Sequence, residues 1–138
     1  MEGSLKDLSA YRIKQAEEML EAAEGNLEIK QYKTSLNRSY YAIFHAIRAV
    51  NIMDGFDSSK HSGVIAHFNH NYLKDGKIDK SLSKIIKTAY YLREKSDYDD
   101  FFIASKADSE KQLLEAKKFV NVIKEFLSEF DGQDLVKN

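Results

Sequence analysis

The sequence predicts an all-α protein with about five helices, and three observations support this class. The 138-residue chain contains no proline and only 6 glycines, so few residues can interrupt a helix. Apolar residues recur at steps of three and four along most of the chain, which is the spacing of one helix face. Hydrophobic residues make up 43% and charged residues 31% of the sequence, as in an ordinary folded domain.

The first predicted helix spans residues 4 to about 30. Its apolar stripe is loose, and Gly25 weakens its end because glycine costs about 1 kcal/mol in a helix. The second, central helix lies within residues 32–55 and carries a regular apolar stripe at steps of four, three, four and three. We expect this stripe to enter the core; its members are Leu36, Tyr40, Ile43, Ile47 and Val50.

The opposite face of the central helix carries Arg38 and His45. They are seven positions apart, so they lie about 20° from each other around the axis and roughly 10 Å apart along it. Four small residues accompany them on this face: Ser35, Ser39, Ala42 and Ala49. Small side chains leave room for another helix, a second subunit or a ligand. We expect a homodimer with two-fold symmetry that closes over this face.

The third and fourth predicted helices follow two turn-rich segments. Residues 60–72 carry apolar and aromatic side chains at steps of three and four, which suits a short third helix. A turn around Gly76 follows, and residues 78–92 then repeat apolar side chains at steps of four and three. This second pattern predicts a longer fourth helix.

The fifth predicted helix begins with a capping signal. Ser105, with Asp108 three positions later, has the spacing of a helix N-cap. Apolar residues follow with near-heptad regularity to about Phe130. We expect one domain of residues 1–130 and a frayed tail of residues 131–138, with no linker between domains.

Composition limits the functions that such a bundle can have. The chain has no cysteine, which excludes disulfides and thiolate sites and fits a reducing compartment. We expect a cytoplasmic protein, because the N-terminus lacks the apolar core of a signal peptide and no apolar run approaches the ~20 residues that span a bilayer. The net charge is −1 and the pI about 6.4, so any contact with RNA or a nucleotide must use a local basic patch.

Several segments together resemble the HEPN domain family, in particular its small stand-alone prokaryotic members. These segments are NRSYYAIFHAIRAV, SKHSGVIAHF with LKDGKID after it, LREKSDYDDF, and the run of residues 109–126. The tyrosine pair followed by alanine, an aromatic residue and histidine is fairly specific in this context, whereas the spacing of the arginine and the histidine alone is a weak signal. The resemblance implies an up-and-down bundle of about five helices, usually dimeric.

The resemblance also implies a chemistry for Arg38 and His45. Some HEPN proteins are metal-independent endoribonucleases, toxins or defence components, with an arginine and a histidine separated by four to six residues on this helix. Six residues separate the two here. The histidine can move protons near neutral pH, and the arginine can hold phosphate oxygens. Without a metal the nucleophile is the adjacent 2′-hydroxyl, so cleavage would form a 2′,3′-cyclic phosphate. In a dimer cleft, two copies of His45 could divide the acid and base roles. Active members commonly have Asn, Asp or His after the arginine, whereas this chain has Ser39.

The alternative is a non-catalytic module that binds a nucleotide or a partner. HEPN toxins resembling this chain pair with a minimal nucleotidyltransferase, which modifies a tyrosine two positions after the histidine. That position is Ile47 here, so the modified residue cannot be carried over. A nucleotidyltransferase partner remains an expectation in either class of function.

Seven further residues are candidates to bind substrate or support the site: Ser39, Tyr41, Lys60, His61, Arg93, Asp97 and Tyr98. The pair Arg93 and Asp97, four positions apart, could simply support the end of the fourth helix, and Tyr98 could cap the core there. Asp97 could instead pair with Arg38 inside the bundle and give that arginine a purely structural role. Lys60 and His61 could extend a basic rim. His61, His67 and His70 lack nearby cysteines, and we expect no metal and no cofactor.

Overall fold

The computed structural model describes the backbone of residues 2–137 and the side chains of residues 4–129. The helical elements, in chain order, are α1 (Glu2–Glu28), α2 (Tyr32–Asn51), a 3₁₀ turn (Ile52–Asp54), α3 (His61–Phe68), a π-helical turn (Asn69–Leu73), α4 (Leu82–Tyr98) and α5 (Lys106–Lys137). The described part of the chain contains no strand. The predicted all-α class with five helices is therefore confirmed.

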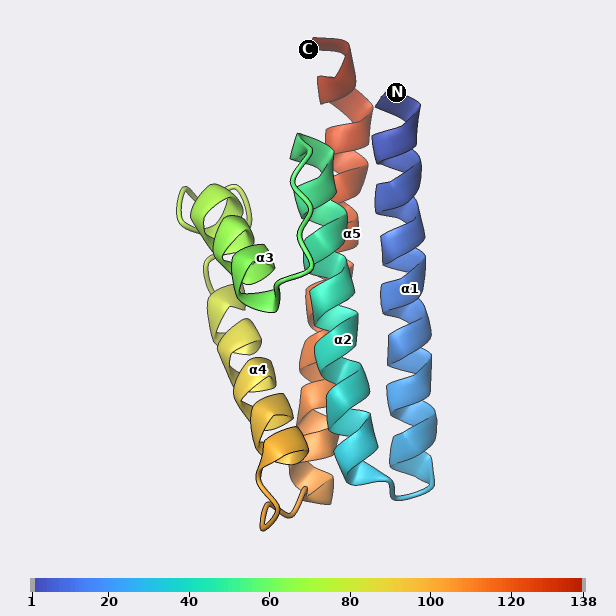
Figure 1. The fold of residues 1–138 in the computed structure, drawn as a ribbon. Coiled ribbons are helices and arrows are strands. Elements are labelled where there is room, and N and C mark those ends of the chain that lie inside the picture. The colour runs from blue at the N-terminus through green and yellow to red at the C-terminus, as the bar shows by residue number, and fades with distance from the viewer. Residues whose placement is uncertain (1, 138) are drawn as a thin grey trace.

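The helices form an up-and-down bundle around α2 (Figure 1). Helices α1, α2 and α5 lie side by side along the long direction of the molecule, and α3 and α4 lie on the other side of α2. The two ends of the chain lie at the same end of the bundle. Because α2 occupies the centre, most of its surface faces other helices.

The apolar stripe predicted for α2 is buried, since none of its five residues is more than 2% exposed. Around it the core gathers large side chains from the other helices, including Phe68, Leu82, Phe119 and Ile123. The burial of the stripe confirms the orientation that the sequence pattern indicated for this face. Burying one such side chain contributes about 1.5–3 kcal/mol before conformational entropy is counted.

The small-residue face of α2 is also buried, and the dimer seam predicted there is wrong. Ser35, Ser39, Ala42 and Ala49 are at most 1% exposed. Helix α1 of the same chain covers this face: Ser9 Oγ on α1 donates to Ala49 O at 2.7 Å, and Ser35 Oγ on α2 donates to Ala23 O at 2.8 Å. The small side chains therefore admit a neighbouring helix, which was one of the three occupants considered.

Helix boundaries differ in detail from the sequence pattern. The third helix ends in a π-helical turn at Asn69–Leu73, and the fourth begins at Leu82 rather than Ile78, which is buried in the preceding loop. The predicted N-cap is confirmed, because Ser105 Oγ accepts a hydrogen bond from Asp108 N at 3.0 Å. Helix α5 continues to Lys137, so its backbone is helical beyond the expected end at Phe130.

The side chains of residues 130–138 and the backbone of Asn138 lie outside the described residues, and fraying of this tail stays a prediction. Among the described residues, no helix combines the length and the apolar character that crossing a membrane requires.

The packing of α1 on α2 predicts the effect of enlarging Ala42. Its side chain is fully buried in this interface, so Ala42→Leu should overpack it and destabilise the fold by about 1–3 kcal/mol. Thermal unfolding followed by circular dichroism measures this. Ala10→Leu, at an exposed position of α1, is the matched control and should leave the melting temperature almost unchanged. A changed oligomeric state with unchanged stability of Ala42→Leu would contradict the packing described here.

Candidate functional site

One narrow stripe of α2 is partly exposed to solvent. From Ser35 to Asn51 every residue is buried apart from five polar ones, which are partly exposed: Asn37, Arg38, Tyr41, His45 and Arg48. At 3.6 residues per turn these five lie within an arc of roughly 100° around the helix. The solvent-facing stripe of this otherwise buried helix therefore includes two arginines, a tyrosine and a histidine. Its only apolar surface is the tyrosine ring.

The C-terminal part of this stripe opens into a shallow hollow of about 460 Å³. Helix α2, the loop after it and the first residue of α3 supply its walls. The lining residues are Tyr41, Phe44, His45, Arg48, Asp57, Ser58, Ser59 and His61. The volume falls within the range of about 300–1,000 Å³ that is usual for small-ligand sites. Two histidines, a guanidinium and a carboxylate therefore meet at one surface.

His61 is fixed in this hollow by two contacts. Its Nδ1 lies 2.9 Å from the hydroxyl of the buried Tyr40, and its ring stacks on Phe44 with ring centroids 4.1 Å apart. Burial, followed by the nearby guanidiniums of Arg93 and Arg48, lowers the pKa of His61. Burial also raises the pKa of Tyr40, so that hydroxyl keeps its proton. It can still donate to or accept from Nδ1.

His45 lines the same hollow and is held less tightly. Its ring lies among aromatic neighbours, with centroids 6.2 Å from Tyr41 and 6.3 Å from Phe44. Its Nδ1 is buried and has no hydrogen-bond partner among the described residues. Burial lowers the pKa of His45, and the positive charges of Arg48 and Arg12 lower it further. The imidazole is therefore neutral over a wider pH range than an exposed histidine.

A carboxylate from the loop joins two arginines beside His45. Asp57 accepts two hydrogen bonds from Arg12, at 3.2 and 3.1 Å, and one from Arg48 at 2.9 Å. Although burial raises the pKa of Asp57, these hydrogen bonds outweigh it and lower the pKa overall. Arg12 is buried on α1, so this cluster ties α1, α2 and the loop together and leaves one net positive charge.

Arg93 on α4 forms an aromatic cluster next to the hollow. Its guanidinium carbon lies 5.4 Å from the Tyr40 ring centroid, 5.6 Å from that of Tyr41 and 5.9 Å from that of Tyr98. Nη2 donates to the Tyr41 hydroxyl at 3.2 Å, and Nε forms an ion pair of 3.0 Å with Asp97. The predicted support of the α4 end by Arg93 and Asp97 is therefore present, but the same arginine also reaches the α2 stripe.

Several predicted site residues have other surroundings than expected. Arg38 does not pair with Asp97; it donates to the neighbouring Asn37 and forms no ion pair within the described part of the chain. The expected structural pair is therefore wrong, because Arg93 takes that carboxylate. Arg38 remains on the exposed stripe but does not line the hollow.

Three supporting residues also need correction or placement. Tyr98 does not cap the core, since it is 70% exposed and contacts Arg93 instead. Ser39 is buried, and its hydroxyl has no hydrogen-bond partner among the described residues, so it cannot orient Arg38 at the surface. Lys60 is exposed just before α3 and lies outside the hollow, whereas its neighbour His61 lines it.

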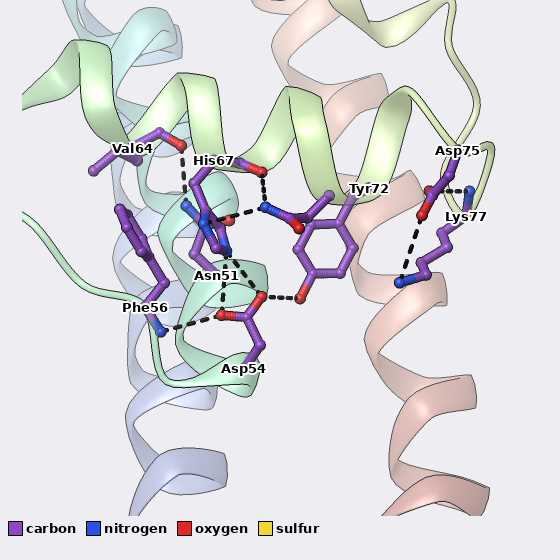
Figure 2. Close-up of polar contacts among 9 residues, drawn as sticks. Asn51, Asp54, Phe56, Val64, His67, Tyr72, Asp75 and Lys77 are labelled. Carbon is purple, nitrogen blue, oxygen red and sulfur yellow. Dashed lines mark hydrogen bonds and ion pairs between the residues drawn. The ribbon is translucent and has the colours of Figure 1, made fainter.

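A second polar cluster anchors α3 and explains why His61 stands where it does. Asp54 lies between His67 and Tyr72 (Figure 2), with His67 Nε2 at 2.9 Å and the Tyr72 hydroxyl at 2.7 Å from the same carboxylate oxygen. Asn51 Nδ2 also donates to Val64 O at 3.0 Å. These bonds hold α3 against the C-terminal end of α2. No group of three metal-binding side chains occurs among the described residues.

Sequence reasoning missed Arg48, Asp57 and Arg12. Arg48 had a usable signal: Arg38, Tyr41, His45 and Arg48 follow one another at steps of three, four and three, which is a polar stripe. The pairing of Arg12 with Asp57 had none, because 45 positions separate the two residues.

The fold and this surface define a class: a helical-bundle protein whose central helix carries a cationic, histidine-bearing site. The family model for the HEPN domain matches residues 9–126. The chain therefore belongs to the HEPN domain family.

The chain is also similar to several curated proteins. The chain is 37% identical over 117 residues to "Putative toxin MJ0605" of Methanocaldococcus jannaschii, which covers 85% of this chain and 87% of that protein. It is 31% identical over 115 residues to "Putative toxin MJ0142" of the same organism, covering 83% and 78% respectively. A "UPF0332 protein" of Archaeoglobus fulgidus is 34% identical over 113 residues, covering 82% of this chain and 90% of that protein.

The Asp57 cluster predicts a pH-dependent loss of stability. The pKa of Asp57 is lowered on folding, so its contribution is present above the ordinary value of about 3.9 and is lost as pH falls through the lowered value. Asp57→Asn should cost about 1 kcal/mol at pH 7, because it leaves the buried Arg12 guanidinium without its carboxylate while solvent screens part of the interaction at the 43% exposed Asp57 side chain. Denaturant unfolding at several pH values measures this difference.

Two features make that measurement specific. The stability gap between wild type and Asp57→Asn should shrink below pH ~4, because there the unfolded wild-type chain takes up a proton at Asp57 while the folded chain, with its lowered pKa, does not. Asp100→Asn, at an exposed position after α4, is the control and should behave as wild type throughout. A gap that stays constant down to strongly acidic pH would contradict the charged role of Asp57.

Proposed function

We propose that this chain is a HEPN protein of the toxin or defence kind that cleaves RNA without a metal, with Arg38 and His45 in its site. The observation that carries the proposal is the exposed stripe of α2. Its partly exposed residues include two arginines, a tyrosine and a histidine, while the rest of the helix from Ser35 onward is buried. The toxin names belong to two relatives, and they support this reading only by similarity.

The chemistry needs three functions, and the stripe can supply two of them. A base must take the proton of the 2′-hydroxyl, and the largely neutral imidazole of His45 is suited to this because its pKa is lowered. A cation must offset the charge that develops on the phosphate. Arg38 is free for this role, since within the described residues it forms no ion pair. An acid must protonate the leaving oxygen.

The second candidate is a module that binds a nucleotide or a protein partner without turnover. The observation that favours it is the aromatic surface at the end of α4. Arg93 lies over three tyrosine rings, and Tyr98 next to it is 70% exposed, so a base could stack there. Phe101 and Ile103, in the loop before α5, are 93% and 86% exposed and would suit a partner such as a minimal nucleotidyltransferase.

We also propose a homodimer, with an interface different from the small-residue face of α2 that the sequence predicted. The small-residue face is covered by α1, so two chains would have to meet through another surface. The C-terminal part of α4 and the loop after it offer such a surface through the same exposed aromatic and apolar side chains. Sizing by light scattering, with Phe101→Asp as a test variant, would show whether this surface joins two copies.

The catalytic proposal predicts that His45→Ala and Arg38→Ala each lose RNA cleavage by ~10²-fold or more, through loss of the base and of the phosphate cation. The product should carry a 2′,3′-cyclic phosphate, chelator should change nothing, and DNA should stay intact because it lacks the 2′-hydroxyl. Cleavage of labelled RNA followed by end-group analysis measures these outcomes. Lys33→Ala, which removes an exposed cation from the first turn of α2, is the control.

Stability separates this reading from a structural one. Because Arg38 forms no ion pair with Asp97, Arg38→Ala should melt within a few degrees of wild type. Wild-type protein that cleaves no RNA at any pH, yet binds mononucleotides in a way that Arg93→Ala abolishes, would contradict the catalytic proposal and establish the binding module.

A further inference from the structure

We propose that His61 is a second acid–base group of this site and protonates the leaving oxygen within the same chain that supplies His45. The inference rests on the RNA-cleavage function proposed above, because it assigns the one role that the α2 stripe leaves vacant. His61 is the first residue of α3, and His45 belongs to α2. Both line the same hollow, and the rings of Tyr41 and Phe44 contact both imidazoles.

The geometry gives His61 one nitrogen for support and one for chemistry. Nδ1 is held 2.9 Å from the Tyr40 hydroxyl, and a hydroxyl can accept from a protonated Nδ1 or donate to an unprotonated one. The bond therefore persists in both protonation states of the ring. Tyr40 is 1% exposed and keeps its own proton, so it does not itself exchange protons with a substrate. Nε2 of His61 is therefore the nitrogen that can exchange a proton with a substrate.

Two aromatic contacts fix the plane of the His61 ring. Phe44 stacks on one side at 4.1 Å with an interplanar angle of 25°, and Tyr41 meets the ring edge-on at 5.7 Å. A catalytic imidazole needs this restriction, because proton transfer depends on the direction of the nitrogen as well as on its distance. The hydrogen bonds of Asp54 to His67 and Tyr72 hold α3 and the turn after it in place (Figure 2). His61, the first residue of α3, is therefore positioned by an anchored helix.

The proposed step balances without any further reactant. Neutral His45 takes the proton of the 2′-hydroxyl, and the 2′-oxygen forms a bond to phosphorus. The bond from phosphorus to the 5′-oxygen breaks, and protonated His61 delivers the proton of Nε2 to that oxygen. The products are a 2′,3′-cyclic phosphate and a free 5′-hydroxyl, with His45 now protonated and His61 neutral.

The charges around the two rings set the expected pH dependence. The groups that face His61 are Arg48, Tyr40 and Tyr41 from α2, and Arg93 and Glu94 from α4. The groups that face His45 are Arg48 and Tyr41 from α2, Arg12 from α1 and His61 from α3. The carboxylate of Asp57, from the loop after α2, lines the hollow beside both rings and is paired with Arg12 and Arg48. Burial and these cations lower both pKa values. The acid form of His61 is lost, and the base form of His45 is gained, as pH rises through the lowered values. The rate should therefore peak below the ordinary histidine pKa of about 6.5.

The test compares two substrates that differ only in the leaving group. One is the dinucleotide uridylyl-3′,5′-adenosine, whose leaving oxygen must be protonated. The other is uridine 3′-(4-nitrophenyl phosphate), whose leaving group departs without a proton. The cleavage rate of His61→Ala should fall by ~10²-fold or more on the dinucleotide. On the nitrophenyl ester it should stay within about tenfold of the wild-type rate. His45→Ala should have a lower cleavage rate on both substrates, because both reactions need the base.

Further variants keep the test interpretable. His61→Gln retains a polar side chain at the start of α3 and should show the same split between substrates if His61→Ala does not fold. Tyr40→Phe keeps the buried ring but removes the hydroxyl; it should move the alkaline limb of the pH profile, which a purely structural role would leave in place. His70→Ala removes an exposed histidine beyond α3 and should leave both activities unchanged.

Each result bears on one conclusion. Equal losses on both substrates, or full activity of the His61 variants on the dinucleotide, would overturn the assignment of His61 while wild-type cleavage still supported the proposed function. Wild-type protein that cleaves neither substrate would overturn both.

Discussion

The close packing of α1 on α2 is the constraint on which the site depends. Serines and alanines at this interface let the two helices approach until serine hydroxyls reach main-chain carbonyls on the opposite helix, as Ser9 and Ser35 do. Core side chains cover the apolar stripe of α2 on other sides. From Ser35 to Asn51 only one arc of the helix remains open to solvent, so the polar residues there are held by a rigid, buried scaffold. A site on the central helix is held more precisely than one on a loop.

Electrostatics then decide what this arc can do. The chain as a whole is nearly neutral, with a formal charge of −1, yet Arg12, Arg48 and Arg93 surround the two histidines of the hollow. Ion pairs with Asp57 and Asp97 neutralise part of this charge. Burial lowers the pKa of both imidazoles, and the positive charge that remains lowers it further and favours an anion between them. A phosphodiester has the charge and the oxygen acceptors that such a surface binds best.

Much of the fold could be predicted from local pattern, and much of the site could not. The apolar stripe of α2 and the Ser105 cap depend on residues three or four positions apart, so the sequence alone revealed both. The small-residue face was compatible with a helix, a subunit or a ligand, and only the three-dimensional packing selects α1. His61 was predicted as a binding or supporting residue but not as a partner of His45, because its link to Tyr40 spans 21 positions. The Arg12–Asp57 contact spans 45 positions and was invisible for the same reason.

If His45 and His61 belong to one site, one bound ligand must affect both imidazoles, and ligand titration followed by nuclear magnetic resonance measures this. The chain has four histidines, so His67 and His70 serve as internal references in the same sample. The probe is uridylyl-3′,5′-adenosine with a 2′-O-methyl group on the uridine, which cannot be cleaved. The imidazole signals of His45 and His61 should shift together along a single binding curve while those of His67 and His70 stay in place. Shifts of only one of the two, two different affinities, or shifts confined to His67 and His70 would contradict a single shared site.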